Sequence, residues 1–196
     1  MRSYPYSYRF PHFNQPSIKA SLKASHIAYA FLGDMLGARP KDRSCYVEGK
    51  ALYEKIAATP DFKIGISRVL KGTQKYQIAL MCAEHDPLTC HRSILVCRHL
   101  AKSELGIYHI LRNGNLETQN KLEDRLLKLH KLSDELPQKT TKIDSGYLQT
   151  KLFNIDVFTE TKGSQQIKNL SETSLAEKLE NAYYLQGQKI AYKEKV

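Results

Sequence analysis

The sequence lacks a long apolar run, has few cysteines and has no signal-like start. No stretch approaches the roughly 18 consecutive apolar residues of a membrane-spanning helix, so none is predicted. The N-terminus is rich in Tyr and Pro, with no charged segment before an apolar core, so no secretory signal is predicted. Four cysteines in 196 residues, without such a signal, predict reduced thiols in a cytoplasmic protein and argue against a disulfide framework.

Acidic residues are also in the minority. Asp and Glu total 20 against 30 Lys and Arg, which gives a net charge of +10, and residues 1–45 hold seven basic but only two acidic residues. This balance predicts an anionic partner, either nucleic acid or a phosphate-bearing small molecule, and no membrane partner. A mean hydropathy of −0.48 with 41% hydrophobic residues is typical of a water-soluble globular protein.

Apolar periodicity predicts an α/β protein. A strand over 75–82, a helix over 90–106 and a strand over 107–111 form a strand–helix–strand unit, which implies a parallel sheet. We therefore predict a three-layer α/β fold, with a mainly parallel sheet and flanking helices. The other predicted elements are a loop over 1–16, a helix over 17–25, a strand over 26–32, a loop over 33–43, and helices over 48–62, 63–72, 115–132 and 171–192.

Two parts of the chain are expected. Residues 1–132 are predicted to form the α/β domain. Residues 133–196 are predicted to form a polar linker, with an apolar island at 152–158, and a C-terminal helical tail that packs on the same domain.

A crowded turn, "MCAEHDPLTCHRS" over 81–93, joins the predicted strand to the predicted helix. Ligands of parallel α/β sheets bind where strands end and helices begin, and a helix N-terminus attracts anions. Arg92 offers a fork of donors suited to phosphate, and His91 is a candidate acid or base. The helix field is expected to lower the pKa of Cys90, which makes this thiol the candidate nucleophile.

Three interpretations of this turn remain open. The first is thiol or His/Arg chemistry on an anionic substrate. The second is a metal site through Cys82, Cys90 and His91, with His85 as a further ligand, but the seven-residue gap between the cysteines is unusual for a zinc knuckle. The third is structural, with the two cysteines packed as small buried hydrophobes. No cofactor or metal is predicted.

The N-terminal segment alternates cations with rings. Arg2 and Arg9 lie among five aromatic residues, namely Tyr4, Tyr6, Tyr8, Phe10 and Phe13. Such rings can stack on bases or line an anion pocket, and they can equally cover the edge of a core.

Four stretches resemble the domain of unknown function 488 family of small prokaryotic proteins. "CAEHDPLTCHR" over 82–92 resembles that family's Cys-x-Glu, Pro and Cys-His-Arg motif, and "RSYPYSYRFPHFN" over 2–14 resembles its Arg-Ser-x-Pro-x-Ser segment. "LGDMLGARP" over 32–40 resembles a glycine-rich loop of the family, and "AYYLQGQKIAY" over 182–192 resembles the tail of longer members.

This resemblance implies a three-layer α/β fold and places the 2–3 segment near the Cys-His-Arg turn, but it supplies no reaction. The usual first strand and helix are absent before Arg2, so an N-terminally shortened fold is expected.

The favoured hypothesis is an enzyme-like protein that binds a phosphate-bearing or nucleic-acid substrate at the Cys-His-Arg turn. The alternative is a non-catalytic nucleic-acid-binding module that uses the N-terminal segment. The predicted residues are Cys90 and His91 for catalysis, Arg2, Ser3, Glu84, Arg92 and Ser93 for binding substrate, and Cys82, Tyr4, Pro5, Phe13 and Pro87 for shaping the pocket.

Overall fold

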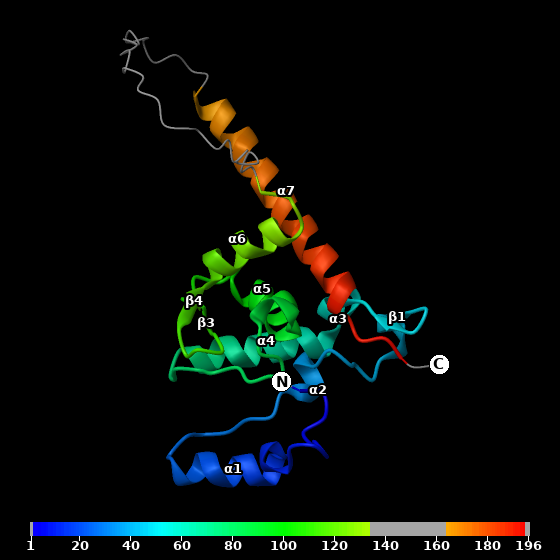
Figure 1. The fold of residues 1–196 in the computed structure, drawn as a ribbon, viewed down its shortest axis with the longest axis vertical. Helices are drawn as coiled ribbons and strands as arrows, with labels where there is room; N and C mark the ends of the chain where they lie inside the picture. The colour runs from blue at the N-terminus through cyan, green and yellow to red at the C-terminus, as the bar shows by residue number, and fades with distance from the viewer. Residues whose placement is uncertain (1, 134–163, 195–196) are drawn as a thin grey trace, which may run out of the picture.

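A computed structural model describes residues 2–133 and 164–194, with side chains for all of these except 164–174. The helices are α1 (Gln15–Ala24), α2 (Gly33–Leu36), α3 (Tyr53–Ala58), α4 (Pro60–Thr73), α5 (Arg98–Leu100), α6 (Gln119–Leu129) and α7 (Ser164–Ile190) (Figure 1). A π-helical segment, Arg92–Cys97, runs directly into α5, and short 3-10 turns span Pro11–Phe13, Arg43–Cys45 and Pro87–Thr89. The strands are β1 (Tyr46–Val47), β2 (Lys50–Ala51), β3 (Tyr108–Ile110) and β4 (Leu116–Thr118).

The mixed α/β character is confirmed, but the three-layer parallel sheet is not. Within the described residues the strands form two antiparallel hairpins, β1 with β2 and β3 with β4. The chain over 107–111 pairs locally because a tight turn, with Gly114 at φ +84°, brings it straight back onto 116–118. Tyr108 and Ile110 are therefore exposed, where burial on both faces was expected.

The predicted strands over 26–32 and 75–82 do not form. His26 has a positive φ, and the amides of Lys75 and Tyr76 donate back to the Gly72 carbonyl at the end of α4. Residues 77–80 donate no backbone hydrogen bond to any other described residue, and Ile27 bonds only back to Leu22. An extended stretch becomes a sheet strand only when a neighbour supplies ladder hydrogen bonds. The prediction of a strand over 75–82 is therefore wrong, and Ile78 stays exposed.

Several helices also begin or end at residues other than those predicted, for local structural reasons. The predicted helix over 48–62 begins instead as the β1–β2 hairpin, because Glu48 and Gly49 both have positive φ, as a tight hairpin turn requires. A helix does stop before Pro60, since α3 ends at Ala58, and Pro60 then opens α4, where the Thr59 hydroxyl accepts a bond from the Phe62 amide at 3.2 Å. The predicted helix over 115–132 starts only at Gln119, because the preceding three residues form β4.

The core surrounds the π-helical segment. Ser93–Cys97 are all buried, and this segment packs against α7, while α4 contacts α5 and α6 contacts α7. The largest fully buried apolar side chains come from the π-helical segment and from α2, α3, α4 and α6: Leu36, Ile56, Phe62, Ile94, Leu95, Leu122 and Leu126. Figure 1 shows α1 apart from this body, and Ile18 is its only buried residue.

Part of the predicted linker, with the apolar island at 152–158, lies outside the described residues. The C-terminal helix α7 is longer than the predicted 171–192 at its start, and its Tyr183 is buried against the body. Among the described helices, none is long and apolar enough to cross a membrane.

A buried hydrogen-bond chain joins the π-helical segment to α6 and α7 through His109. The Gln119 amide nitrogen donates to the Tyr183 hydroxyl at 2.7 Å and to Glu123 at 2.9 Å, so its oxygen must accept from His109 Nε2 at 2.9 Å. His109 Nδ1 is then left as an acceptor for the Ser93 hydroxyl at 3.4 Å. This tautomer requires a neutral imidazole.

Acidification is expected to destabilise the fold through His109. Burial lowers the pKa of His109 and outweighs the hydrogen bond with Gln119, which raises it; the charge of Arg92 lowers the pKa further, and those of Glu117 and Glu123 raise it slightly. The unfolded state therefore takes up this proton first, so the stabilisation is present above the unfolded pKa of about 6.5 and is lost as pH falls below it. Urea unfolding at about pH 7.5 and pH 5 measures this.

The matched variants are His109→Gln and His12→Gln, since His12 lies in the exposed N-terminal segment. The wild type and His12→Gln should lose more stability on acidification than His109→Gln. An equal loss in all three proteins would contradict the assignment.

Candidate functional site

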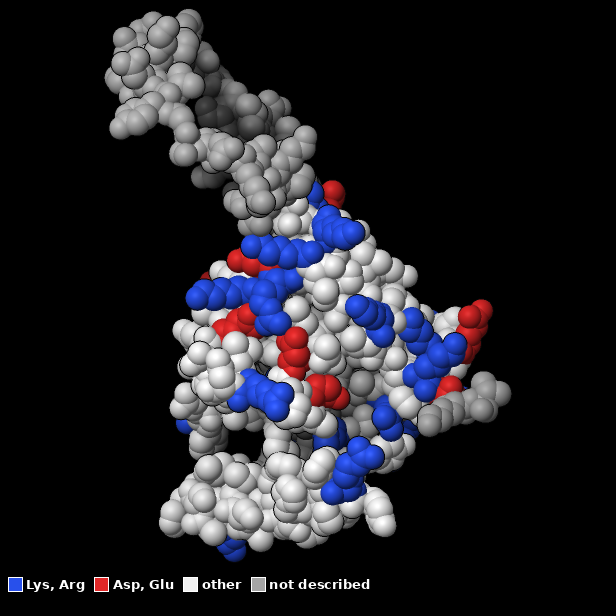
Figure 2. All heavy atoms as spheres, in the orientation of Figure 1, with Lys and Arg blue, Asp and Glu red and all other residues white. Residues whose placement is uncertain are grey.

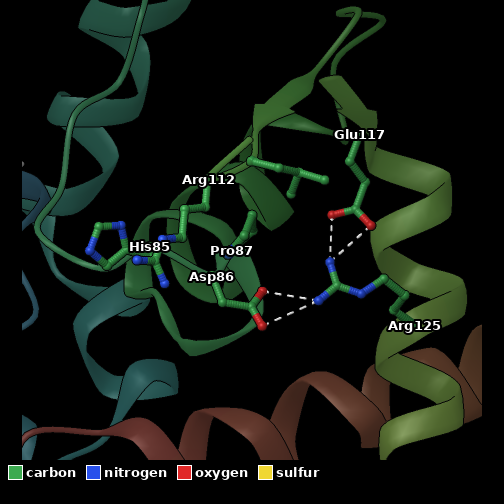
Figure 3. A pocket seen from close by; sticks show the side chains of 7 residues that line it. His85, Asp86, Pro87, Arg112, Glu117 and Arg125 are labelled. Carbon is green, nitrogen blue, oxygen red and sulfur yellow. Dashed lines mark hydrogen bonds and ion pairs between the residues drawn. The ribbon is translucent and has the colours of Figure 1, made fainter. Parts of the chain in front are cut away.

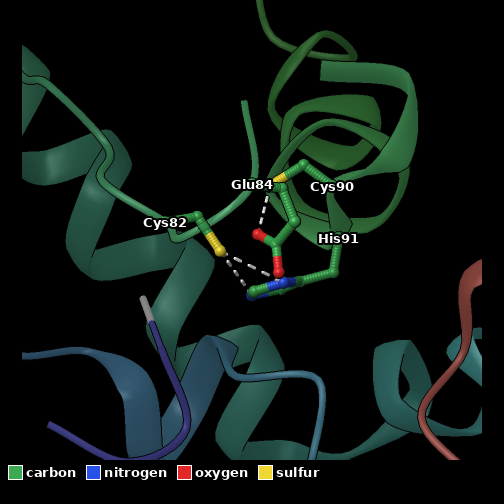
Figure 4. A group of neighbouring side chains, drawn as sticks. All are labelled: Cys82, Glu84, Cys90 and His91. Atoms are coloured by element: carbon green, nitrogen blue, oxygen red, sulfur yellow. Dashed lines mark hydrogen bonds between the residues drawn. The ribbon is translucent and has the colours of Figure 1, made fainter. Parts of the chain in front are cut away.

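Four side chains of the turn meet at one point (Figure 4). Cys82, Glu84, Cys90 and His91 each place a sulfur, oxygen or nitrogen atom within 4.8 Å of the others. The Cys90 thiol donates to Glu84 Oε2 at 3.2 Å, and Cys82 Sγ lies 3.4 Å from His91 Nδ1. We call these four residues the cluster, and residues 82–91 the cysteine loop.

The loop is shaped by its own capping interactions. The Asp86 carboxylate accepts a bond from the Leu88 amide at 3.0 Å, which starts the turn Pro87–Thr89. The Cys90 amide closes this turn by donating to the Pro87 carbonyl at 3.1 Å. Cys90 thereby comes to the start of the helical stretch, beside the end of the extended segment that carries Cys82.

The cluster is closed toward the body and open at Glu84. Cys90 is 0% exposed and His91 is buried, Cys82 is half-buried, and Glu84 is exposed. A molecule or ion from solvent would therefore reach the cluster past the Glu84 carboxylate.

The two thiols differ in acidity, in the opposite sense to the sequence prediction. A hydrogen bond to Cys82, burial and the negative charge of Glu84 raise the pKa of Cys90, so the prediction of a lowered pKa at the helix start is wrong. The hydrogen bond from Cys90, followed by the contact with His91, lowers the pKa of Cys82. The pKa of Cys82 is thus lowered and that of Cys90 raised, so Cys82 is the more acidic sulfur.

Tyr53 is a neighbour of the cluster that no sequence motif indicated. It is buried at the start of α3, and burial, followed by the charges of Cys90, Glu84 and Cys82, raises the pKa of its hydroxyl. Only the tertiary packing of α3 brings it to the loop, so no local pattern in the sequence could have identified it.

The other residues predicted at the turn face inward. Arg92 Nη1 points at the Leu80 carbonyl at 3.4 Å, and Ser93 is buried on His109. Pro87 is buried in its turn. Arg92 is half-buried, and its positive charge favours the thiolate of Cys90.

The predicted N-terminal residues are held by other partners. The Arg2 guanidinium donates to the Phe13 carbonyl at 2.7 Å, and the Ser3 hydroxyl accepts from the Arg39 amide at 3.0 Å. No hydrogen bond links Arg2 or Ser3 to the cluster among the described residues. The Pro5 carbonyl accepts from the Gln15 amide at 2.9 Å.

All five rings of the N-terminal segment are exposed, from 44% to 103%, which excludes the option that they cover a core edge; they are Tyr4, Tyr6, Tyr8, Phe10 and Phe13. Tyr4 and Phe13, predicted to shape the pocket, therefore face solvent.

A shallow hollow of about 370 Å³ borders the loop at His85, Asp86 and Pro87 (Figure 3). Its wall includes His85, Arg112 and Arg125. Arg125 bonds both Asp86 and Glu117 at 2.8–3.2 Å, so its charge is balanced. Arg112 has no ion pair among the described residues, and it lies next to His85 in Figure 3.

The fold and the cluster thus define a mixed α/β protein with a Cys, Glu, Cys and His site on one loop. The chain belongs to the family described as domain of unknown function DUF488, whose model matches residues 1–98, a range that contains the whole cluster. A search of curated proteins and a search of solved structures each find no match to the chain.

Proposed function

We propose that this chain is an enzyme that binds a phosphate-bearing or nucleic-acid substrate at the cysteine loop. The observation that carries the proposal is that neighbouring residues of the cysteine loop belong to the cluster and to the hollow. Glu84 belongs to the cluster, while the next residue, His85, lines the hollow that also holds Arg112. One short stretch therefore contributes both to a group of reactive side chains and to a hollow with an arginine that could bind an anion.

Arg112 is the residue we assign to the anionic group of the substrate. Its guanidinium has no carboxylate partner among the described residues, and a planar fork of donors matches phosphate oxygens. His85 is the second polar group beside it, whereas Arg125 is held by its two carboxylates and shapes the wall. The bond-changing end of the substrate would lie at the cluster.

The net charge of +10 supports this substrate class, because a basic surface attracts polyanions. On the face shown in Figure 2, Lys and Arg side chains are spread over the body with acidic side chains among them. General attraction of this kind brings polyanions to the surface, and the fork of Arg112 would supply local selectivity.

Replacing Arg112 with alanine is expected to weaken binding of a labelled single-stranded oligonucleotide about tenfold. The slope of log Kd against log salt should also fall by about one charge, because one phosphate contact is lost. Fluorescence anisotropy over a salt series measures both quantities. Arg68→Ala is the charge-matched control, since Arg68 is an exposed arginine on α4 away from the hollow. Equal weakening in the two variants would contradict a specific role for Arg112.

A second candidate function is a nucleic-acid-binding module without catalysis, and the five exposed N-terminal rings favour it. Aromatic side chains that face solvent beside Arg9 can stack on unpaired bases. Under this alternative the same oligonucleotide would still bind Arg112→Ala normally, and would lose affinity when Tyr6 and Tyr8 are both changed to serine.

A further inference from the structure

We infer that the cluster is a binding site for one thiophilic divalent metal ion, for which zinc is the best match. Its four ligands would be the sulfurs of Cys82 and Cys90, a carboxylate oxygen of Glu84 and a ring nitrogen of His91. This inference rests on the proposed function, because the metal would be a cofactor bound at the loop where the reaction is proposed to occur.

The distances fit a tetrahedral centre. Bonds of about 2.0–2.3 Å from zinc to nitrogen, oxygen and sulfur place neighbouring ligand atoms roughly 3.3–3.8 Å apart. The Cys90–Glu84 pair is 3.2 Å apart, the Cys82–His91 pair is 3.4 Å apart, and every pair lies within 4.8 Å. Small side-chain rotations would therefore complete the shell without movement of the backbone.

The backbone explains how a seven-residue gap, unusual for a zinc knuckle, can still serve. Cys82 and Glu84 flank a bend at Ala83, and their sulfur and carboxylate oxygen both lie in the cluster. Cys90 and His91 are adjacent at the start of a helical stretch, and the Pro87–Thr89 turn carries the chain between the two pairs. His85, the fourth ligand considered from the sequence, lines the hollow that borders the loop.

The donor set and its surroundings favour zinc over harder cations. Two thiolates and an imidazole suit zinc, whereas magnesium and calcium take oxygen ligands. Two thiolates and one carboxylate around a divalent ion leave one excess negative charge. The positive charge of Arg92 partly offsets it, because it favours the thiolate of Cys90. Binding the metal replaces the thiol protons with metal–sulfur bonds and releases the protons to the buffer; no electron is transferred.

The burial pattern divides the ligands into two kinds. Cys90 and His91 are buried and fixed on the helical stretch, so they would form the permanent part of the shell. Glu84 is exposed, so it would be the ligand that gives way to water or substrate. A shell that can open at one position is typical of catalytic rather than structural zinc.

Metal content and a cobalt spectrum test the inference on the full chain. As purified, the protein is expected to contain about one zinc per chain by elemental analysis. After chelation, titration with cobalt(II) chloride should give a thiolate-to-cobalt charge-transfer band and the strong visible bands of tetrahedral cobalt. Zinc chloride should then displace the cobalt and abolish both.

Four variants locate the ligands. Cys90→Ser should lose about half of the charge-transfer intensity, since Cys82 remains as a thiolate ligand, while Cys97→Ala, which removes a buried thiol outside the cluster, should keep the full intensity. Glu84→Gln keeps the fold because the side chain is exposed, and it should weaken cobalt affinity about 10- to 100-fold. His91→Ala should shift the visible bands. A folded wild-type protein that gives no thiolate-to-cobalt band, or equal loss of the band in Cys97→Ala, would overturn the inference.

The metal result and the anion result can fail separately. Loss of the cobalt band with intact, Arg112-dependent oligonucleotide binding would refute the metal and leave the proposed substrate class standing. A normal cobalt band, together with oligonucleotide binding that is unchanged in Arg112→Ala, would support the metal site and refute the proposed role of Arg112.

Discussion

Replacing Phe62 with alanine is expected to lower the free energy of unfolding by about 3–5 kcal/mol. Phe62 lies in the first turn of α4 and is only 1% exposed. Its ring meets His99 edge-on, with centroids 5.1 Å apart, next to the helical stretch that begins at the cysteine loop. The variant loses the transfer free energy of the ring and leaves a cavity that the surrounding helices cannot fill.

Urea unfolding followed by circular dichroism measures the loss, and Phe13→Ala is the matched control. Phe13 is the same residue type at 44% exposure, so its replacement should change stability by less than about 0.5 kcal/mol. Losses of similar size in the two variants would contradict the packing that we describe around α4.

Arg125→Ala is expected to cost about 2 kcal/mol of unfolding free energy and to loosen the cysteine loop. Arg125 joins Asp86, in the loop, to Glu117, on β4. Glu117 is only 7% exposed, and breaking a buried pair costs about 3–5 kcal/mol because a charge is left unpaired. Solvent reaches Arg125 and Asp86, at 39% and 47% exposure, so screening reduces the expected loss.

Arg112→Ala is the control, since Arg112 lines the same hollow but has no ion pair among the described residues. Its effect on stability should stay below about 0.5 kcal/mol. The double variant Arg125→Ala/Glu117→Gln should recover part of the loss, because no buried carboxylate then lacks a partner. If the double variant is less stable than Arg125→Ala, the ion pair is not the cause of the loss.

The members of the cluster could be found from the sequence because they lie in one short stretch. Cys82, Glu84, Cys90 and His91 are all within ten residues, and the motif itself indicated them. Which atoms meet could not be predicted, since that depends on the Asp86-capped turn that places Cys90 against Glu84. Arg112 and Tyr53 come from distant segments, so tertiary contacts alone bring them to the loop.

The helices were predicted more closely than the sheet for a related reason. The apolar stripe of α6 and the Thr59–Pro60 start of α4 are local features that one segment carries by itself. A strand needs a partner, and the sequence of 75–82 specifies an apolar extended chain without specifying its neighbour. The hairpins formed instead where tight turns, such as the one at Gly49, returned the chain onto itself.

Ordering the unpaired stretch over 77–80 costs conformational entropy, and this cost opposes the contacts that hold Cys82 in the cluster. Because no ladder bonds fix these residues, restricting them costs roughly 1–2 kcal/mol per residue, which the contacts at Cys82 and Leu80 must offset. Whatever binds Cys82 more firmly therefore also restricts the preceding backbone. Occupancy of the cluster and the solvent exchange of the 77–80 amides are thermodynamically linked, so each can be measured through the other.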